Sequence, residues 1–321
     1  MKKNYLTALL ILTIHFVFSQ DYSKIDNIVK YYPKYFYSFE NLAEQISNDF
    51  DSEIDQVRAL YFWVSNNIKY DYDHNLSLKI KINETDSYQS KIEYDRILID
   101  RYAKTCLKEN RGVCEGYSLI IKNTLDILNI ENKLIKGYAK TGIQDIGNIS
   151  DIKNHSWNAI KINNTWRLID ATMSTGLTRT NQEEFNFNDN YFLVEPEDLI
   201  LSHFPKFEEW QLLNNTVERT TFFYAPFFHD TYYFSKLKLH DKTLGLIKVK
   251  PNDKISLTFE TIDPRKTYLY KFDKDELPSV LTLKKRKEKY ITSIIFKKKN
   301  NTRLTIYENG NPVISFKIDA I

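Results

Sequence analysis

Apolar residues recur at intervals of three and four positions through the first part of the chain, over residues 21–70. This spacing places them on one face of an α-helix. One apolar stripe ends at Pro33, and Ser38 and Ser52 (or Asp51) stand directly before the next two. A side-chain oxygen at such a position accepts hydrogen bonds from the free N–H groups of the first helical turn. The pattern predicts three helices that brace another part of the fold.

The middle of the chain changes from helical to strand-like spacing. Residues 71–113 are polar and irregular, with one helical stretch near residues 97–102. Residues 114–128 place their leucines and isoleucines on one face and predict a strong helix. The period then becomes two, and Asn163-Asn164 has the composition of a tight hairpin turn. Strands are predicted at residues 133–139, 157–162 and 165–169.

The end of the chain is rich in short alternating runs. A short strand is expected at residues 191–194, and a helical segment that begins at Glu195 leads towards Trp210 and Leu213. After it, the runs are separated by turn-forming Pro, Asn, Asp and Gly residues, which is typical of an antiparallel β-sandwich. These runs cover residues 246–250, 255–261, 267–272, 290–296, 303–307 and 313–318.

Composition sets the class of protein. With 321 residues, and roughly 100–200 residues per domain, the length suggests two domains, with three as the alternative. A hydrophobic content of 42% is enough for packed cores, and only eight Gly and eight Pro exclude a collagen-like or linker-like chain. A net charge of +3 gives no reason to expect a nucleic-acid partner. We expect an α+β domain over residues 20–215 and a β-domain over residues 216–321.

The first nineteen residues have the pattern of a secretory signal peptide. Lys2 and Lys3 give a basic start, an apolar run follows over residues 5–18, and Val17 and Ser19 suit a signal-peptidase site. The run is shorter than the ~20 residues that a bilayer requires, so a retained anchor is the lesser alternative. We expect cleavage after Ser19, no stable membrane span afterwards, and a secreted, periplasmic or cell-surface location.

A cysteine stands where a helix is predicted to begin. Cys114 would lie in the first helical turn, where unpaired N–H groups and the helix dipole stabilise a thiolate. Gly112 and Gly116 on either side would let a substrate backbone approach. The only other cysteine, Cys106, could form a disulfide with Cys114 or be a buried bystander.

The predicted hairpin supplies the partners that a reactive thiolate needs. With a two-residue turn at 163–164, paired residue numbers add up to about 327, so His155 faces the chain just past Asp170. The Asp170 carboxylate can then accept a hydrogen bond from the imidazole and fix its tautomer. Cys114, His155 and Asp170 in this order have the arrangement of a thiol acyl-transfer triad. Trp157 next to His155 could be a sheet-core residue or could bind substrate, and His203 shows no ligand-like spacing.

These motifs together resemble the transglutaminase-like superfamily of papain-like folds, and in particular secreted bacterial members similar to the kyphoscoliosis peptidase. The stretches that carry the resemblance are FWVSNNIKYDYD (residues 62–73), GVCEGYS (112–118), HSWNAIKINNTWRLIDAT (155–172) and YFLVEPEDLILSHFPKFEEWQLL (191–213). The resemblance implies an α+β fold in which the cysteine helix packs on an antiparallel sheet. Family members include crosslinking enzymes, peptidases, deamidases and inactive relatives.

The chain departs from the family pattern at two points. Met173 stands where relatives usually carry Trp, and the side chain that completes an oxyanion hole is not evident. The N–H of Cys114 would be the first donor, and Tyr88 and Gln89 are candidates for the second. Absence of a second donor would cost about 2.7–4 kcal/mol of transition-state stabilisation.

The predicted function is acyl-thioester chemistry on peptide or glutamine amide bonds. We favour hydrolysis over transfer to an amine, because water is abundant and nothing in the sequence marks an amine site. The expected partner is a protein or peptide substrate, with a cell-envelope protein as one candidate, and no metal or other cofactor is expected. The alternative is a catalytically inactive scaffold that binds a surface protein or polysaccharide.

Overall fold

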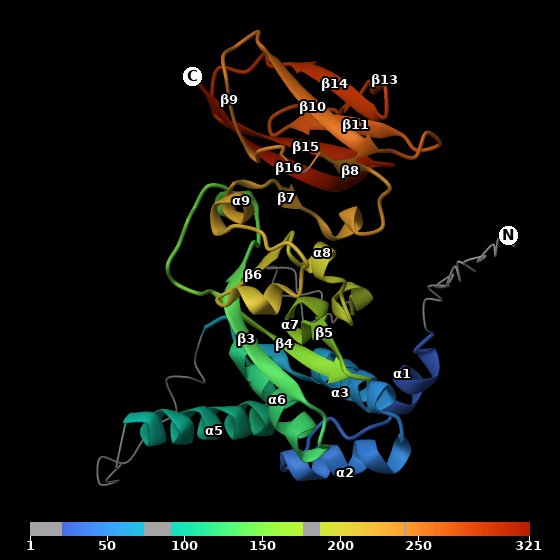
Figure 1. The fold of residues 1–321 in the computed structure, drawn as a ribbon, viewed down its shortest axis with the longest axis vertical. Coiled ribbons are helices and arrows are strands. Elements are labelled where there is room, and N and C mark those ends of the chain that lie inside the picture. Colours follow the sequence, from blue (N-terminus) through green and yellow to red (C-terminus); the bar gives the residue numbers. More distant parts are fainter. Residues whose placement is uncertain (1–20, 74–90, 176–186, 241) are drawn as a thin grey trace, which may run out of the picture.

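The chain folds into a lower part of helices on a sheet and an upper part of β-strands (Figure 1). The computed structural model describes residues 21–73, 91–175, 187–240 and 242–321. The predicted signal segment, residues 1–19, and the candidate oxyanion residues Tyr88 and Gln89 lie outside the described residues. Within the described ranges, no helix has both the length and the apolar character needed to cross a bilayer.

Three N-terminal helices form where the apolar stripes predict them. Ser38 and Ser52 are both N-caps: their oxygens accept hydrogen bonds from the third residue beyond, at 3.3 and 3.2 Å. The capping satisfies an N–H that would otherwise be unpaired at the start of each helix. The helices are α1 (Ser23–Val29), α2 (Phe39–Asp49) and α3 (Glu53–Asn67).

Two further helices meet at the predicted cysteine. Helix α5 (Lys91–Glu109) is longer than its predicted stretch, because only a few of its positions, such as Ala103 and Leu107, are buried, and the apolar pattern is correspondingly sparse. Helix α6 (Cys114–Ile127) begins and ends close to where it was predicted. Two short strands, β1 (Lys69–Tyr70) and β2 (Arg111–Gly112), pair in parallel just before α6.

A four-stranded antiparallel sheet in the order β5-β4-β3-β6 lies against α6 (Figure 1). The predicted hairpin is confirmed: Ala159 pairs with Leu168, and Asn163 and Asn164 have φ angles of 49° and 62°, as a type I′ turn requires. Asn158 donates a hydrogen bond of 3.0 Å to the carbonyl oxygen of Ser118, which joins the sheet to α6. The strands are β3 (Asn132–Ala139), β4 (His155–Ile162), β5 (Thr165–Ile169) and β6 (His203–Pro205).

The segment between β5 and the β-domain differs from the prediction. The strand expected at 191–194 is wrong: a 3-10 turn, η2 (Asp189–Tyr191), is followed by a single bridge from Val194 to Leu168. The helix expected from Glu195 ends early, as α8 (Pro196–Leu199). The chain then forms β6, because the free edge of β3 offers backbone partners that a local apolar pattern does not reveal.

The C-terminal part consists of two sheets around one apolar core. Strands of both sheets contribute buried side chains, including Phe259 of β10 and Phe316 of β16. One pair, β9 with β16, is parallel, which the antiparallel pattern did not predict. The strands are β7 (Phe227–Phe228), β8 (Lys238–Leu239), β9 (Leu246–Val249), β10 (Lys254–Thr261), β11 (Tyr268–Phe272), β12 (Ser279–Val280), β13 (Lys284–Arg286), β14 (Lys289–Ile295), β15 (Thr302–Glu308) and β16 (Asn311–Ala320).

Contacts between the two parts run through residues on both sides of position 215. Helix α9 (Arg219–Tyr224) places Phe222 and Phe223 in a small apolar cluster with Tyr138 and Phe204 of the lower part. The Lys140 ammonium is buried beside α9 and donates a hydrogen bond of 2.8 Å to the Ala225 carbonyl oxygen. The domain boundary after residue 215 stays a prediction.

Candidate active site

The thiol of Cys114 lies at the start of α6. Cys114 is the first residue of the helix, Val113 is the N-cap, and the cysteine is 9% exposed. Among the described residues, nothing accepts a hydrogen bond from the Cys114 N–H. The N–H groups of the first helical turn have no acceptor within the helix, so this group can donate to a ligand oxygen, and the thiol lies at the positive end of the helix dipole.

The hairpin brings His155 and Asp170 together beside this thiol. His155 is the first residue of β4, and its Nε2 lies 2.5 Å from Oδ2 of Asp170. The side chain of Cys114 also interacts with this imidazole and contributes to its raised pKa. Because Nε2 faces Asp170, Nδ1 is the ring nitrogen that remains for the thiol. The structure thus places the three predicted residues in one connected group, and their catalytic role stays a prediction.

Asp170 also begins a short helix, α7 (Ala171–Ser174). Its Oδ1 accepts a hydrogen bond of 2.9 Å from the N–H of Met173, so one carboxylate oxygen caps α7 and the other receives His155. The N–H of Asp170 donates to the Tyr191 carbonyl at 2.9 Å, and Tyr61 of α3 is hydrogen-bonded with Ser174 of α7. The bracing helix α3 therefore supports the element that orients the carboxylate.

Charge in the group favours an imidazolium next to a carboxylate. Burial alone would lower the pKa of His155, but the charge and hydrogen bond of Asp170, together with the interaction with Cys114, raise it to about 10. Burial would raise the pKa of Asp170, yet its bonds with His155 and His203 hold that pKa well below its ordinary value. The arrangement favours transfer of the thiol proton to His155.

The sequence reasoning missed His203. Its Nε2 lies 3.0 Å from Oδ2 of Asp170, and its side chain is fully buried. The residue belongs to β6, a three-residue strand within a segment that was expected to be helical. No local signal could have found it, because only the pairing of β6 with β3 brings it beside a carboxylate 33 residues earlier in the chain.

The glycines that flank Cys114 adjoin the second cysteine. A Cβ atom would lie 2.9 Å from the Cys106 sulfur at Gly112 and 2.7 Å from it at Gly116. Both glycines therefore give room for Cys106, and substrate contact by either one stays a prediction. Both cysteines are free thiols, and burial raises the pKa of Cys106 to about 12. Of the two alternatives for Cys106, the structure shows the buried thiol.

The Trp157 ring packs against the rings of both His155 and His203. Its ring stacks on His155 at 6.0 Å between centroids and meets His203 edge to face at 5.2 Å. It is 1% exposed, so in this structure it supports the imidazoles from within the sheet. A Cβ at Gly137 would lie 2.6 Å from the Trp157 ring and 2.2 Å from the Phe204 carbonyl oxygen, so this glycine lets the ring and β6 approach each other. Substrate binding by Trp157 stays a prediction.

Two histidines and a carboxylate also form a possible metal-ligand set. One ligand atom from each of His155, Asp170 and His203 lies within 4.8 Å of the others. The same nitrogen and oxygen atoms are hydrogen-bonded to one another, so an ion would have to replace these bonds. Their proximity is explained by hydrogen bonding.

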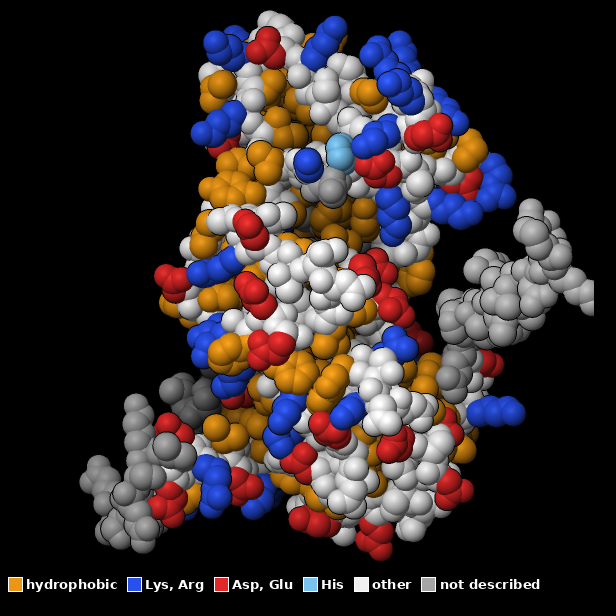
Figure 2. Space-filling model, viewed as in Figure 1, with side chains coloured by type: hydrophobic (Ala, Val, Ile, Leu, Met, Phe, Trp, Pro, Cys, Tyr) orange, Lys and Arg blue, Asp and Glu red, His pale blue; other side chains and the backbone are white. Residues whose placement is uncertain are grey.

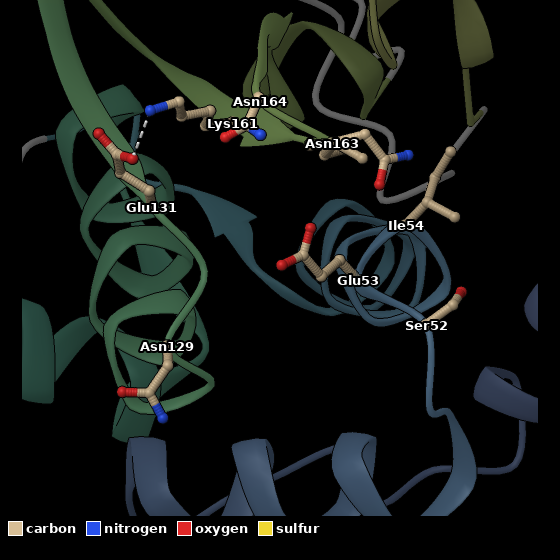
Figure 3. Close-up of a pocket in the computed structure, with 9 residues that line it drawn as sticks. Ser52, Glu53, Ile54, Asn129, Glu131, Lys161, Asn163 and Asn164 are labelled. Carbon is tan, nitrogen blue, oxygen red and sulfur yellow. Dashed lines mark hydrogen bonds and ion pairs between the residues drawn. The ribbon is translucent and has the colours of Figure 1, made fainter.

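A separate hollow of about 600 Å³ opens at the opposite end of β4 (Figure 3). It lies between the start of α3, the end of α6 and the β4–β5 hairpin, and an ion pair of 2.9 Å joins Lys161 and Glu131 at its edge. His155 is the first residue of β4 and the hollow adjoins the last, Ile162, so the strand length separates the two places. The hollow contains no member of the Cys-His-Asp group.

The comparisons agree with this geometry. Residues 40–171 match the model of the Transglutaminase-like superfamily, so this part of the chain is similar to that superfamily, and its α+β fold agrees with the match. The chain is 26% identical to mouse kyphoscoliosis peptidase over 252 residues and 25% identical to the human protein over 251. These matches cover 76% and 77% of this chain but only 34% and 35% of the relatives, about a third of their length.

A solved structure of a TGase is also similar. The similarity covers 56% of this chain and 40% of the TGase chain, with 15% identity and a TM-score of 0.30.

Proposed function

We propose that this protein is an enzyme that forms an acyl-thioester on Cys114, and that it hydrolyses peptide or glutamine amide bonds. The observation that carries the proposal is the connected group in which a thiol at a helix start faces an imidazole held by a buried carboxylate. The match to the transglutaminase-like model supports the same chemistry.

The first half of the reaction forms the thioester. His155 Nδ1 takes the proton from Cys114, and the thiolate sulfur attacks the carbonyl carbon of the amide. The developing oxyanion accepts a hydrogen bond from the unpaired N–H of Cys114. The imidazolium then gives its proton to the leaving nitrogen, and the C–N bond breaks. Asp170 remains ionised throughout and stabilises the imidazolium.

The second half releases the acyl group. His155 removes a proton from water, the hydroxide oxygen attacks the thioester carbon, and the C–S bond breaks. The imidazolium then returns its proton to the sulfur, which leaves the acid product and the free thiol. An amine in place of water would give a crosslinked or modified protein. We propose hydrolysis as the main outcome, with a secreted or cell-surface location and a protein substrate, for which a cell-envelope protein is one candidate.

Alkylation of the thiol tests the first step. Iodoacetamide should label Cys114 at pH 5.5–6 far faster than an ordinary thiol with a pKa of about 8.5, because the proposed proton transfer to His155 would leave a thiolate at the sulfur. The fully buried Cys106 serves as an internal control, and Cys114→Ala identifies the labelled site by peptide mass spectrometry. Slow labelling whose rate follows an ordinary thiol pKa would overturn the proposal.

Reaction type is tested with the chain lacking residues 1–19, casein and a fluorescent primary amine. New small fragments indicate a peptidase, ammonia released without fragments in a reaction that omits the amine indicates a deamidase, and incorporated label indicates a transferase. Each activity should disappear in Cys114→Ala. Fragments or ammonia would support the hydrolysis proposal, whereas incorporated label alone would contradict it.

A binding scaffold is the second candidate, and a basic surface favours it. Strand β13 is the exposed edge of its sheet, and each of its residues, Lys284, Lys285 and Arg286, is exposed. Figure 2 shows many Lys and Arg side chains over the upper part of the molecule. Such a surface suits an anionic polymer, although lysines also protect sheet edges from pairing. Slow alkylation with salt-dependent binding to an anionic polysaccharide would favour this function.

A further inference from the structure

We propose that His203 is a positioning residue of the active site, which holds the Asp170 carboxylate in place for His155 and is itself held by Ser202 and Tyr233. The proposal deepens the proposed function and rests on it for its catalytic meaning. The pKa of the Asp170 carboxyl, on which the proposal depends, can be measured without any substrate.

The hydrogen bonds have one consistent direction. A carboxylate only accepts, so Nε2 of His203 donates to Asp170 across 3.0 Å. In a neutral imidazole the other nitrogen then accepts, and Nδ1 receives the Ser202 hydroxyl at 2.8 Å. The Ser202 oxygen can in turn accept from the Tyr233 hydroxyl at 3.1 Å. The series Tyr233, Ser202, His203, Asp170 thus fixes the tautomer of His203.

A neutral His203 does not compete with the His155 imidazolium for the negative charge of Asp170. Burial lowers the pKa of His203 in spite of the neighbouring carboxylate, so the ring donates a hydrogen bond without carrying a positive charge. A second imidazolium would compete for the same oxygen, since His155 and His203 both approach Oδ2 of Asp170. The titratable groups that face His203 are Asp170, His155, Tyr191, Tyr233 and Asp230.

The supporting residues lie outside the part that matches the family model. That match ends at residue 171, whereas His203 is in β6 and Tyr233 directly follows the turn η4 (Asp230–Tyr232). A second bond, 2.8 Å from the Tyr191 hydroxyl to Asp230, joins the turn η2 to η4. The chain after residue 215 therefore reaches the carboxylate of the site through His203.

The test measures how fast iodoacetamide alkylates Cys114 in the full chain as a function of pH. The acid midpoint is the pH at which this rate falls to half of its maximum on the acid side. Loss of a donor to a carboxylate raises its pKa, and a protonated Asp170 no longer stabilises the imidazolium. His203→Ala should therefore move the acid midpoint of the alkylation rate to higher pH by about one unit. His203→Gln, whose amide can still donate to Asp170, should stay near the wild type. Tyr233→Phe should give a smaller shift in the same direction as His203→Ala.

His229→Gln is the matched control. This histidine also binds a serine, with Nε2 2.9 Å from the Ser315 hydroxyl, but it lies in the β-domain, and its replacement should leave the midpoint unchanged. A merely structural role would lower thermal stability without moving the midpoint. An unmoved midpoint in His203→Ala, or equal shifts in the Ala and Gln variants, would overturn the proposal. If His203→Ala does not fold, the proposal is tested by the other two variants: the midpoint should move in Tyr233→Phe and should not move in His203→Gln.

Carbon-13 NMR of the Asp170 carboxyl separates the two proposals. If the wild-type thiol alkylates like an ordinary one, the proposed function fails, but the carboxyl titration still tests His203. A higher Asp170 pKa in His203→Ala than in the wild type would support the positioning role in that case. Equal pKa values in the two proteins would reject it. Asp170→Asn assigns the resonance.

Discussion

At the residue scale, Asp170 performs two tasks with its two oxygens. One oxygen caps α7, and the other accepts hydrogen bonds from both buried histidines. The capping role fixes the carboxylate within a rigid turn, so its direction is set before any substrate binds. The same residue type could have been a plain turn residue, and only its neighbours distinguish the two cases.

Asp170→Asn separates charge from capping. Asparagine is an equally good N-cap, so α7 should remain formed while the negative charge is lost. Without the charge, burial of the imidazole lowers the pKa of His155. Because the imidazolium is then less stable, alkylation of Cys114 at pH 6 should slow by about 100-fold or more. Asp170→Ala, which also loses the cap, should be less stable as well as slow. An alkylation rate within a few-fold of the wild type would contradict the role of the charge.

The same substitution should change how stability depends on pH. The raised pKa of His155 contributes stability that is complete below about pH 6.5 and is lost as pH rises through about 10. The lowered pKa of Asp170 contributes stability that is lost as pH falls below about 4. The difference in free energy of unfolding between wild type and Asp170→Asn should therefore be largest between about pH 4 and 6.5. Urea denaturation across pH 3–10 measures it, and a constant difference would contradict the assignment.

At the element scale, the site depends on how closely α5 approaches the start of α6. Gly112 and Gly116, each two residues from Cys114, leave the space that the sulfur of Cys106 fills. The sequence placed both glycines beside the reactive thiol and predicted a substrate approach. The structure adds a packing reason, which sequence spacing could not show because Cys106 reaches them from another helix.

Gly116→Ala tests this packing. The added methyl would meet the Cys106 sulfur at 2.7 Å, and overpacking of this kind costs about 1–3 kcal/mol, which exceeds the gain of about 1 kcal/mol in helix propensity. Cys106→Ala makes room for the methyl, so the double variant should recover most of the loss. A double-mutant cycle by chemical denaturation measures the coupling, and additive effects would show that the two residues do not compete for space.

At the scale of the whole molecule, charge separates along the chain. Residues 20–215 carry 22 Lys and Arg against 30 Asp and Glu, while residues 216–321 carry 21 against 12. The small overall charge of +3 hides this difference. A basic β-region beside an acidic site region means that the two parts attract each other, and added salt weakens this attraction.

Lys140 is a cation buried where the two parts meet. Burial lowers its pKa to about 7, and its ammonium faces the Phe222 ring and the carbonyl oxygen of Ala225. Because the unfolded chain binds this proton more tightly, the free energy of unfolding should rise with pH between about 7 and 10.5.

Lys140→Met should remove that dependence. Relative to the wild type, the variant should be most stable at pH 6 and lose its advantage towards pH 10, by about 1.4 kcal/mol for each unit of pKa shift at most. Urea denaturation at pH 6, 8 and 9.5 measures the effect, with Lys133→Met, an exposed lysine of β3, as the control. Parallel stability curves for wild type and Lys140→Met would show that the ammonium is not desolvated.

Local features of this chain were determined by the sequence itself. Ser38 and Ser52 cap helices because a serine oxygen acts within three residues, and the hairpin register follows from a two-residue turn and a period of two. Cys114 at a helix start and His155 at a strand start are local facts of the same kind. Short-range hydrogen bonds and side-chain periodicity decide such features, so the residues alone reveal them.

Tertiary structure determined the features that depend on contacts between residues far apart in the chain. The pairing of β6 with β3 turned an expected helix into a strand and placed His203 against Asp170. The packing of α5 against α6 placed Cys106 against two glycines. The energy of these contacts comes from burial and hydrogen bonds between segments far apart in the chain, and it outweighs local preference. A single sequence read by local pattern therefore predicts the group of Cys114, His155 and Asp170 but not the second histidine beside its carboxylate.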